Sequence, residues 1–359
     1  MRRERRYIGL MGLMSLMGFM GLMGLVGCSM IDEDQSDCDQ QARIDYELRL
    51  VTNMETEIET QLNTESEQDL ANELRQFLSG IFTDFAHDVD LSFYDTVGDS
   101  IRLQHDQHIM DANQATYTLN LPMRQYMHLA AANLVDNQQV SLVNDEFCHP
   151  SMLQQVTGDT VASHTTGLFT ARQPMDVLGS VDQNFDVRLY MANCAAVLVV
   201  DPRDVDPSEM TVYTTGFATG YHICDSSYVF GRSPIVNTSL VGNAVMGQPF
   251  AFCSVTFPSK PGADTRTVIE TEEPFISQEG DETLWEFRVY VPEQDVASTR
   301  GHRPITETIL RLKKRLKAGQ LFILKGWLDR KGIFYTKDKT VGVSVTLDWN
   351  KNQEQDVPL

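Results

Sequence analysis

The chain has 359 residues, of which 42% are hydrophobic, and it carries a formal net charge of −21. A chain of this length exceeds one usual hydrophobic core, so two domains are expected. The strongly acidic balance argues against nucleic acid or an anionic membrane surface as the partner of the bulk surface.

The first 27 residues have the features of an export signal. Four arginines within the first six positions precede an uncharged stretch from Tyr7 to Gly27. At about 20 residues this stretch is long enough to span a bilayer, but glycine or serine recurs at every third position, and glycine disfavours a helix by about 1 kcal/mol. A basic start, an apolar middle and a small residue before a break are typical of a secretory signal. An uncleaved anchor helix is the alternative, and both interpretations place residues 28–359 outside the cytoplasm.

The end of this signal resembles the bacterial lipobox, which is cut directly before its cysteine. The residues concerned are Leu25-Val26-Gly27-Cys28. We therefore expect cleavage after Gly27 and acylation of Cys28, with palmitate-type chains. Each buried methylene contributes about 0.8 kcal/mol, and stable anchoring takes more than one chain. Removal of residues 1–27, which hold four arginines and one glutamate, takes the net charge from −21 to −24.

The leader after Cys28 is acidic. Its Asp32-Glu33-Asp34 run is similar to the export signal of surface lipoproteins in Bacteroidetes-type bacteria. That resemblance implies a lipid-anchored, surface-exposed protein of the outer membrane.

Five cysteines remain after Cys28, and an odd number cannot all pair within one chain. They are Cys38, Cys148, Cys194, Cys224 and Cys253. Cys194 lies in an apolar run and is expected to be a buried free thiol. The pairing of the others stays open.

Period-two alternation dominates the rest of the chain. In residues 43–50 it places Ile44, Tyr46, Leu48 and Leu50 on one face of a predicted N-terminal strand. The same pattern recurs in residues 88–95, 116–121, 185–192, 285–291 and 340–349. One polar face and one apolar face are typical of antiparallel strands in a sandwich. We therefore expect an all-β fold of two β-sandwich domains.

Residues 66–86 follow a helical period instead. Their apolar side chains are Leu70, Leu74, Phe77, Leu78, Ile81 and Phe85. This spacing predicts an amphipathic helix, which we expect to pack on the first sandwich. The predicted organisation is a signal peptide (1–27), a lipidated leader (28–42), an N-terminal β-sandwich domain (43–148) and a C-terminal one (149–359).

Common catalytic and metal-binding motifs are missing from the sequence. It contains no G-x-S-x-G, no phosphate-binding loop and no H-E-x-x-H. We interpret His105 and His108 as part of a solvated loop. Cys148 and His149 are adjacent, and neighbours on an extended chain diverge, which disfavours a catalytic pair. We expect no enzyme activity, no metal site and no cofactor.

Residues 300–339 are the exception to the acidic bulk, with twelve lysines and arginines against three acidic residues. The densest part contains Arg311, Lys313, Lys314, Arg315 and Lys317. Three interpretations stay open. The segment is a solvated basic face, a docking face for an acidic protein neighbour, or a contact for phospholipid headgroups.

The two ends of the chain resemble the FimB/Mfa2 family, the fimbrillin-associated anchor lipoproteins of Bacteroidetes-type pili. The features concerned are Cys28, the acidic leader, Cys38 and the strand over residues 43–51, together with the terminal "VGVSVTLDWN". The resemblance implies two transthyretin-like, Greek-key sandwiches and a base position in the pilus. Its implied partners are fimbrial stalk subunits, and the outer membrane through acyl chains on Cys28. It also implies control of fibre length and no catalysis.

Two other classes of function stay open. A surface glycan-binding lipoprotein would also be rich in strands, and exposed aromatic side chains on loops would favour it. Trp285, Trp327 and Trp349 all lie in predicted strands, which does not favour it. A secreted hydrolase is disfavoured because the motifs are missing.

Overall fold

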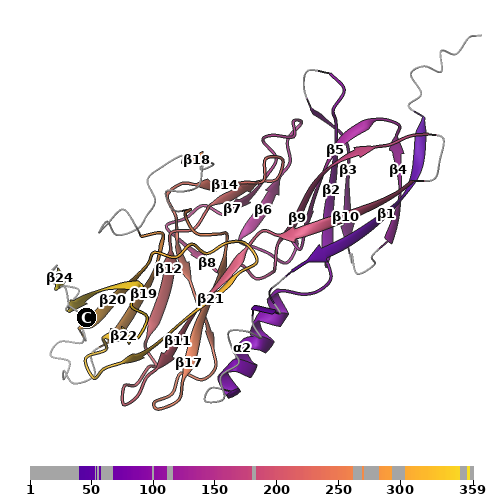
Figure 1. The fold of residues 1–359 in the computed structure, drawn as a ribbon. Coiled ribbons are helices and arrows are strands. Elements are labelled where there is room, and N and C mark those ends of the chain that lie inside the picture. The colour runs from indigo at the N-terminus through magenta and orange to yellow at the C-terminus, as the bar shows by residue number, and fades with distance from the viewer. Residues whose placement is uncertain are drawn as a thin grey trace, which may run out of the picture. The chain divides into compact units, whose positions relative to one another are not determined.

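The structure, a computed structural model, describes residues 40–52, 54, 56–57, 68–98, 101–110, 116–179, 183–261, 269–270, 283–292, 304–347 and 354–355. Met1–Asp39 and Gln40–Leu359 form separate units, and all of the described residues belong to the second unit. Within this part of the chain the secondary structure is mainly strand, with the helix α2 and helical positions at Met54, Thr56 and Glu57 (Figure 1). The predicted all-β class is confirmed.

A sheet of seven strands, in the order β3-β2-β5-β9-β10-β1-β4, forms the first sandwich. Its strands are β1 (Gln41–Val51), β2 (Asp88–Asp95), β3 (Arg102–Met110), β4 (Thr116–Pro122), β5 (Gln125–Ala132), β9 (Phe169–Asp176) and β10 (Gln183–Met191). β9 and β10 pair at only two positions, Thr170 with Tyr190 and Phe169 with Met191. The sheet turns back on itself there, and apolar residues from both halves share one core.

Two further sheets form a second sandwich. The smaller sheet has the order β16-β17-β11-β21-β22, and the larger has the order β24-β23-β20-β19-β12-β15-β8. The bounds of the smaller are β11 (Cys194–Asp201), β16 (Ser239–Val241), β17 (Phe250–Thr256), β21 (Leu321–Leu328) and β22 (Phe334–Thr336). Those of the larger are β8 (Thr160–Ala162), β12 (Thr211–Thr215), β15 (Ile235–Asn237), β19 (Trp285–Pro292), β20 (Ile305–Leu312), β23 (Val341–Leu347) and β24 (Glu354–Gln355). Trp285, Phe287 and Leu310 lie fully buried in the core between them.

A fourth sheet carries the disulfide of the described residues. Its order is β18-β14-β13-β7-β6. The strands are β6 (Val140–Val143), β7 (Met152–Gln155), β13 (Gly220–His222), β14 (Ser227–Phe230) and β18 (Ile269–Glu270). Cys148 and Cys224 are disulfide-bonded and link the segment before β7 to the turn after β13.

The helix α2 (Gln68–Ile81) lies within the range that the helical period predicts, and its buried apolar residues are Leu70, Ala71, Leu74 and Leu78. The expectation that it packs on the first sandwich needs correction. α2 contacts β16 and β17 of the second sandwich, beside which it lies in Figure 1. Its apolar side chains belong to a buried cluster that also contains side chains of β1. The cluster includes the side chains of β11 and β17 that point away from the core of the second sandwich. Phe85 lies beyond the helix and is 49% exposed.

Strand pairing crosses the boundary predicted at residues 148 and 149. β6 and β7 lie on either side of it and pair with each other. β9 and β10 follow it in sequence but belong to the first sheet with β1. The first sandwich therefore draws on both predicted segments. The division into two domains at this position stays a prediction.

Candidate functional site

The N-terminal strand β1 lies inside the first sheet rather than at its edge. It pairs with β10 in parallel over eight positions, from Ile44 to Val51. On its other side it pairs with β4 in antiparallel register over seven positions, from Gln41 to Glu47. β1 therefore has both of its backbone edges paired from Ile44 to Glu47 and one edge paired over the rest of its length.

The apolar face of β1 points into the core, as its alternation predicts. Ile44 and Tyr46 are fully buried and Leu48 is 6% exposed. Leu50, near the end of the strand, is half-buried and packs against the same cluster. Burial of such side chains stabilises a fold by about 1.5–3 kcal/mol each. The strand is thus held by its side chains as well as by its backbone.

A buried hydrogen bond ties β1 across the sandwich to β5. The Tyr46 hydroxyl lies 2.8 Å from Nε2 of His128, and Nδ1 of the same ring lies 3.0 Å from the Ser92 carbonyl oxygen. A carbonyl only accepts, so Nδ1 carries the proton and Nε2 accepts from Tyr46. Burial lowers the pKa of His128 to about 4 and raises the pKa of Tyr46 above its ordinary range. Both groups are therefore neutral at physiological pH.

Sequence reasoning missed His128. The signal was available, because His128 alternates with Tyr126, Ala130 and Ala132 on the buried face of β5. A polar residue on such a face needs a partner, but the sequence does not show that Tyr46 supplies it.

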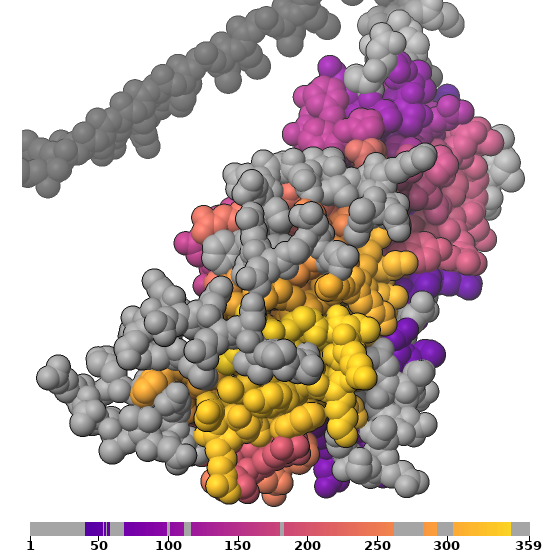
Figure 2. Space-filling model, turned by 60° about the vertical axis from the view of Figure 1, so that its left-hand side comes forward, coloured from indigo at the N-terminus to yellow at the C-terminus, as the bar shows by residue number. Residues whose placement is uncertain are grey.

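The basic residues of the segment differ in their exposure. Lys313, Lys314 and Lys317 are exposed and Arg315 is half-buried. Two hydrogen bonds hold the backbone of this segment in place. The Trp285 indole N–H donates to the Lys314 carbonyl at 2.9 Å, and the Leu316 N–H donates to Ser259 Oγ at 2.8 Å. In Figure 2 the yellow C-terminal part of the chain lies on the face toward the viewer.

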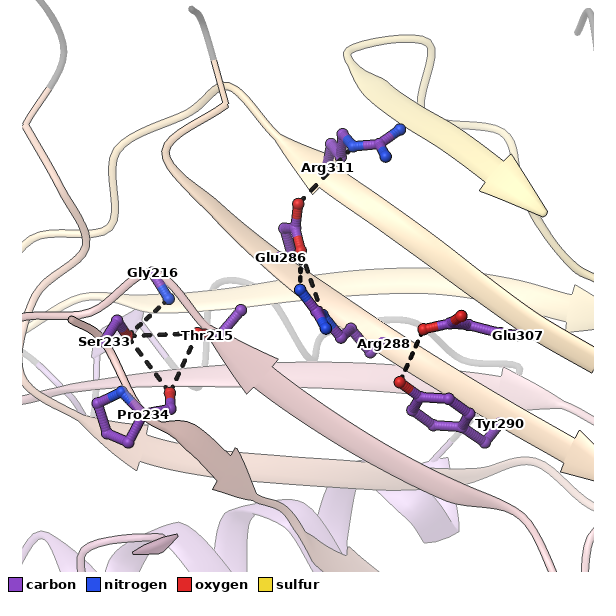
Figure 3. A network of polar contacts seen from close by, with 9 residues as sticks. All are labelled: Thr215, Gly216, Ser233, Pro234, Glu286, Arg288, Tyr290, Glu307 and Arg311. Carbon is purple, nitrogen blue, oxygen red and sulfur yellow. Dashed lines mark hydrogen bonds and ion pairs between the residues drawn. The ribbon is translucent and has the colours of Figure 1, made fainter. Parts of the chain in front are cut away.

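Arg311 must be removed from the predicted docking patch. Its side chain is 8% exposed, and its Nε lies 3.7 Å from a carboxylate oxygen of the fully buried Glu286. Arg288 lies on the other side of that carboxylate, at 3.2 Å (Figure 3). A buried carboxylate requires such partners. Arg311 therefore belongs to a structural ion-pair network on β19 and β20.

Figure 3 also shows how the end of β12 is fixed near this network. Ser233 Oγ accepts a hydrogen bond from the Gly216 N–H at 2.9 Å. Gly216 has φ +100, and a Cβ there would lie 2.6 Å from the Trp285 Cα. Only glycine satisfies both demands, since it lacks a Cβ and adopts positive φ without strain.

The structure shows where the histidine and cysteine motifs lie. His105 and His108 lie on strand β3, so the predicted loop is wrong. Three positions apart on a strand, they face opposite sides of the sheet. His149, Cys224 and Asp225 come close enough to suggest metal ligands, but Cys224 is disulfide-bonded and offers no thiolate.

The remaining cysteines bear out part of the sequence analysis. Cys194 is a buried free thiol, as predicted, and so is Cys253. Burial raises the pKa of each to about 12, so both are protonated and unreactive at physiological pH.

The lipidation prediction concerns residues outside those described. Gly27, Cys28 and Cys38 all precede residue 40, where the described part begins. Among the described helices, none is long and apolar enough to cross a membrane.

No family model matches the chain, and no curated protein matches it. Solved structures from three bacteria are similar to it. The anchor protein Mfa2 of fimbriae from Porphyromonas gingivalis has a TM-score of 0.44 and 9% identity, covering 86% of this chain and 97% of that one. A candidate adhesin from Bacteroides ovatus gives 0.46 and 10%, covering 89% and 96%. A candidate polysaccharide-binding protein from Bacteroides thetaiotaomicron gives 0.47 and 8%, covering 88% and 98%. TM-scores below 0.5 at these identities do not decide what this chain does.

Proposed function

We propose that this protein is the lipid-anchored base subunit of a cell-surface fimbria. The observation that carries the proposal is the position of β1, which follows the predicted acylated Cys28 by thirteen residues and is paired on both sides. A segment of that length reaches at most about 45 Å when extended. The lipid is thereby connected to a strand in the interior of a sheet.

The placement of β1 suits a tether. Force applied at its N-terminus acts along the strand and loads the hydrogen bonds to β4 and β10 together. Withdrawal of β1 would also expose Ile44, Tyr46 and Leu48, which are buried, and would break the Tyr46–His128 hydrogen bond. An edge strand with one partner and one open side would resist less.

The same placement accounts for a closed end of the fibre. The family that the two ends of the chain resemble implies joining of subunits by strand donation, in which one subunit completes the sheet of the next. Here β1 occupies the position between β4 and β10 in its own sheet. No neighbouring strand can enter there, so growth stops at this subunit.

The described end of the chain also turns inward. β24 pairs with β23 of its own sheet, Gln355 with Val345 and Glu354 with Thr346. This pairing supports the interpretation that the C-terminal segment is not donated to a neighbour. It leaves the exposed lysines of residues 313–317 as the proposed contact for an acidic stalk subunit.

Deletion of the gene tests the proposal. Stalk subunits should still polymerise, because the joining strands are their own, but the fibres should appear in the medium and should differ in length. Mass spectrometry of the complemented strain should find acylated Cys28 and no residues 1–27. Fibres that stay cell-bound in the deletion strain would exclude an anchor role.

A further inference from the structure

An open cleft of about 510 Å³ lies where β9 and β10 separate from each other. Residues of both strands line it, and so does the turn between β13 and β14. The turn residue Cys224 is disulfide-bonded to Cys148, which fixes this wall. The cleft is therefore preformed, as small-molecule sites usually are.

The cleft combines aromatic rings with planar polar groups. Tyr190 on β10 is 57% exposed, and Tyr221 on β13 is half-buried and packs against Tyr228 at a ring distance of 4.6 Å. Thr170 and Arg172, which alternate along β9 and so share one face of the strand, line the cleft beside them. Such a large exposed tyrosine inside a cleft offers an apolar face with a polar tip.

The charges in the cleft oppose those of the whole chain. Arg188 lies 3.7 Å from Asp186, which Arg49 also approaches at 3.7 Å. Within the described part of the chain, Arg172 forms no ion pair or hydrogen bond. The lining thus has two guanidinium groups and one carboxylate, on a protein whose net charge is −21. A guanidinium pairs with a carboxylate through two parallel hydrogen bonds.

We propose that this cleft binds a carbohydrate that carries a carboxylate, such as a uronic acid unit. The tyrosine rings contact the apolar C–H face of a sugar, Thr170 bonds a hydroxyl, and Arg172 takes the carboxylate. An added peptide strand fits less well. Addition requires a free run of backbone donors, whereas Pro174 on β9 has no N–H and Thr170 pairs with Tyr190 at the base of the cleft.

Binding of trigalacturonic acid to the full-length protein in detergent tests the inference. The methyl ester of the same saccharide is the uncharged control. Isothermal titration should show binding of the acid, at least tenfold weaker binding of the ester, and weakening by salt. A wider array of uronate- and sialate-containing oligosaccharides extends the search. No binding to any acidic saccharide would overturn the inference.

Cleft variants locate the site. Arg172→Ala and Tyr190→Ala should each weaken binding at least tenfold. Arg330→Ala and Phe85→Ala are matched controls, because both side chains are well exposed and neither lines the cleft. These two variants should bind the saccharide as the wild-type protein does. Equal binding by cleft and control variants would contradict the proposal. So would stronger binding of an acidic peptide that competes with the saccharide.

Discussion

The Tyr46 hydroxyl and Nε2 of His128 lie 2.8 Å apart in the core of the first sandwich. Tyr46 belongs to the strand nearest the predicted lipid, and His128 belongs to β5 in the other half of the same sheet. The bond connects the proposed tether to the body of the fold.

Tyr46→Phe removes the donor and leaves a fully buried nitrogen without a partner. We expect the free energy of unfolding to fall by about 1–3 kcal/mol, measured by urea titration. Tyr190→Phe on the neighbouring β10 is the matched control, because its hydroxyl is on an exposed side chain. A change of less than 0.5 kcal/mol for Tyr46→Phe would show that the bond contributes nothing.

Two buried histidines predict acid sensitivity. Burial lowers the pKa of His128 to about 4 and the pKa of His164 to about 3, both below the usual 6.5. The unfolded state therefore binds more protons between those values, and stability falls as pH falls. Each histidine contributes a slope of about 1.4 kcal/mol per pH unit at most.

His164→Leu separates this effect from general acid unfolding. Neither ring nitrogen of His164 has a hydrogen-bond partner in the structure, so leucine removes a titrating group without breaking a bond. The variant should lose less stability than the wild-type protein between pH 6 and pH 4. Equal slopes in urea titrations would mean that His164 is accessible to protons in the folded state.

Leu48→Ala tests whether the core holds β1. Leu48 is 6% exposed, so truncation should lower the free energy of unfolding by about 2–5 kcal/mol. Arg43→Ala on the exposed face of the same strand should change it by less than about 0.5 kcal/mol. A loss below 1 kcal/mol for Leu48→Ala would place β1 outside the core.

The disulfide predicts a labelling pattern. In the denatured, unreduced protein an alkylating agent should label Cys194 and Cys253 but spare Cys148 and Cys224. Replacing Cys148 and Cys224 by alanine opens a link across 76 positions and should cost about 2–5 kcal/mol. Peptide mapping that finds Cys148 labelled would contradict both statements.

The basic segment predicts two different outcomes. Lys313→Glu with Lys314→Glu changes exposed residues, so the protein should fold and, if the segment docks a stalk subunit, shed fibres. Arg311→Met leaves the buried Glu286 with one cation fewer and should cost about 3–5 kcal/mol. Thermal unfolding of both variants distinguishes a loss of stability from a loss of docking. Fibres that stay bound to cells with the double variant would show that the basic segment does not dock a stalk subunit.

The sequence was sufficient where a local pattern decides the structure. Alternation in residues 43–50 placed Ile44, Tyr46 and Leu48 in the core, and the helical period located α2. It was insufficient where distant segments meet. The pairing of β1 with β10 joins positions about 140 apart, and the partner of His128 lies 82 positions away. The sequence does not distinguish Arg311 from the other basic residues of its segment, because its buried partner Glu286 is known only from the structure. His105 was misjudged because a polar edge strand has the composition of a loop.

Retention of fibres by cells shows whether lipid on Cys28 anchors the fibre. The signal of residues 1–27 is exchanged for one that is cleaved without lipidation, and Cys28 is changed to alanine, so that the folded protein is still exported. The fraction of fimbrial protein in the medium is then compared with that of the wild-type strain. We expect the fibres to assemble and to be released. Fibres that remain on the cells, with the unlipidated protein present and folded, would contradict this expectation.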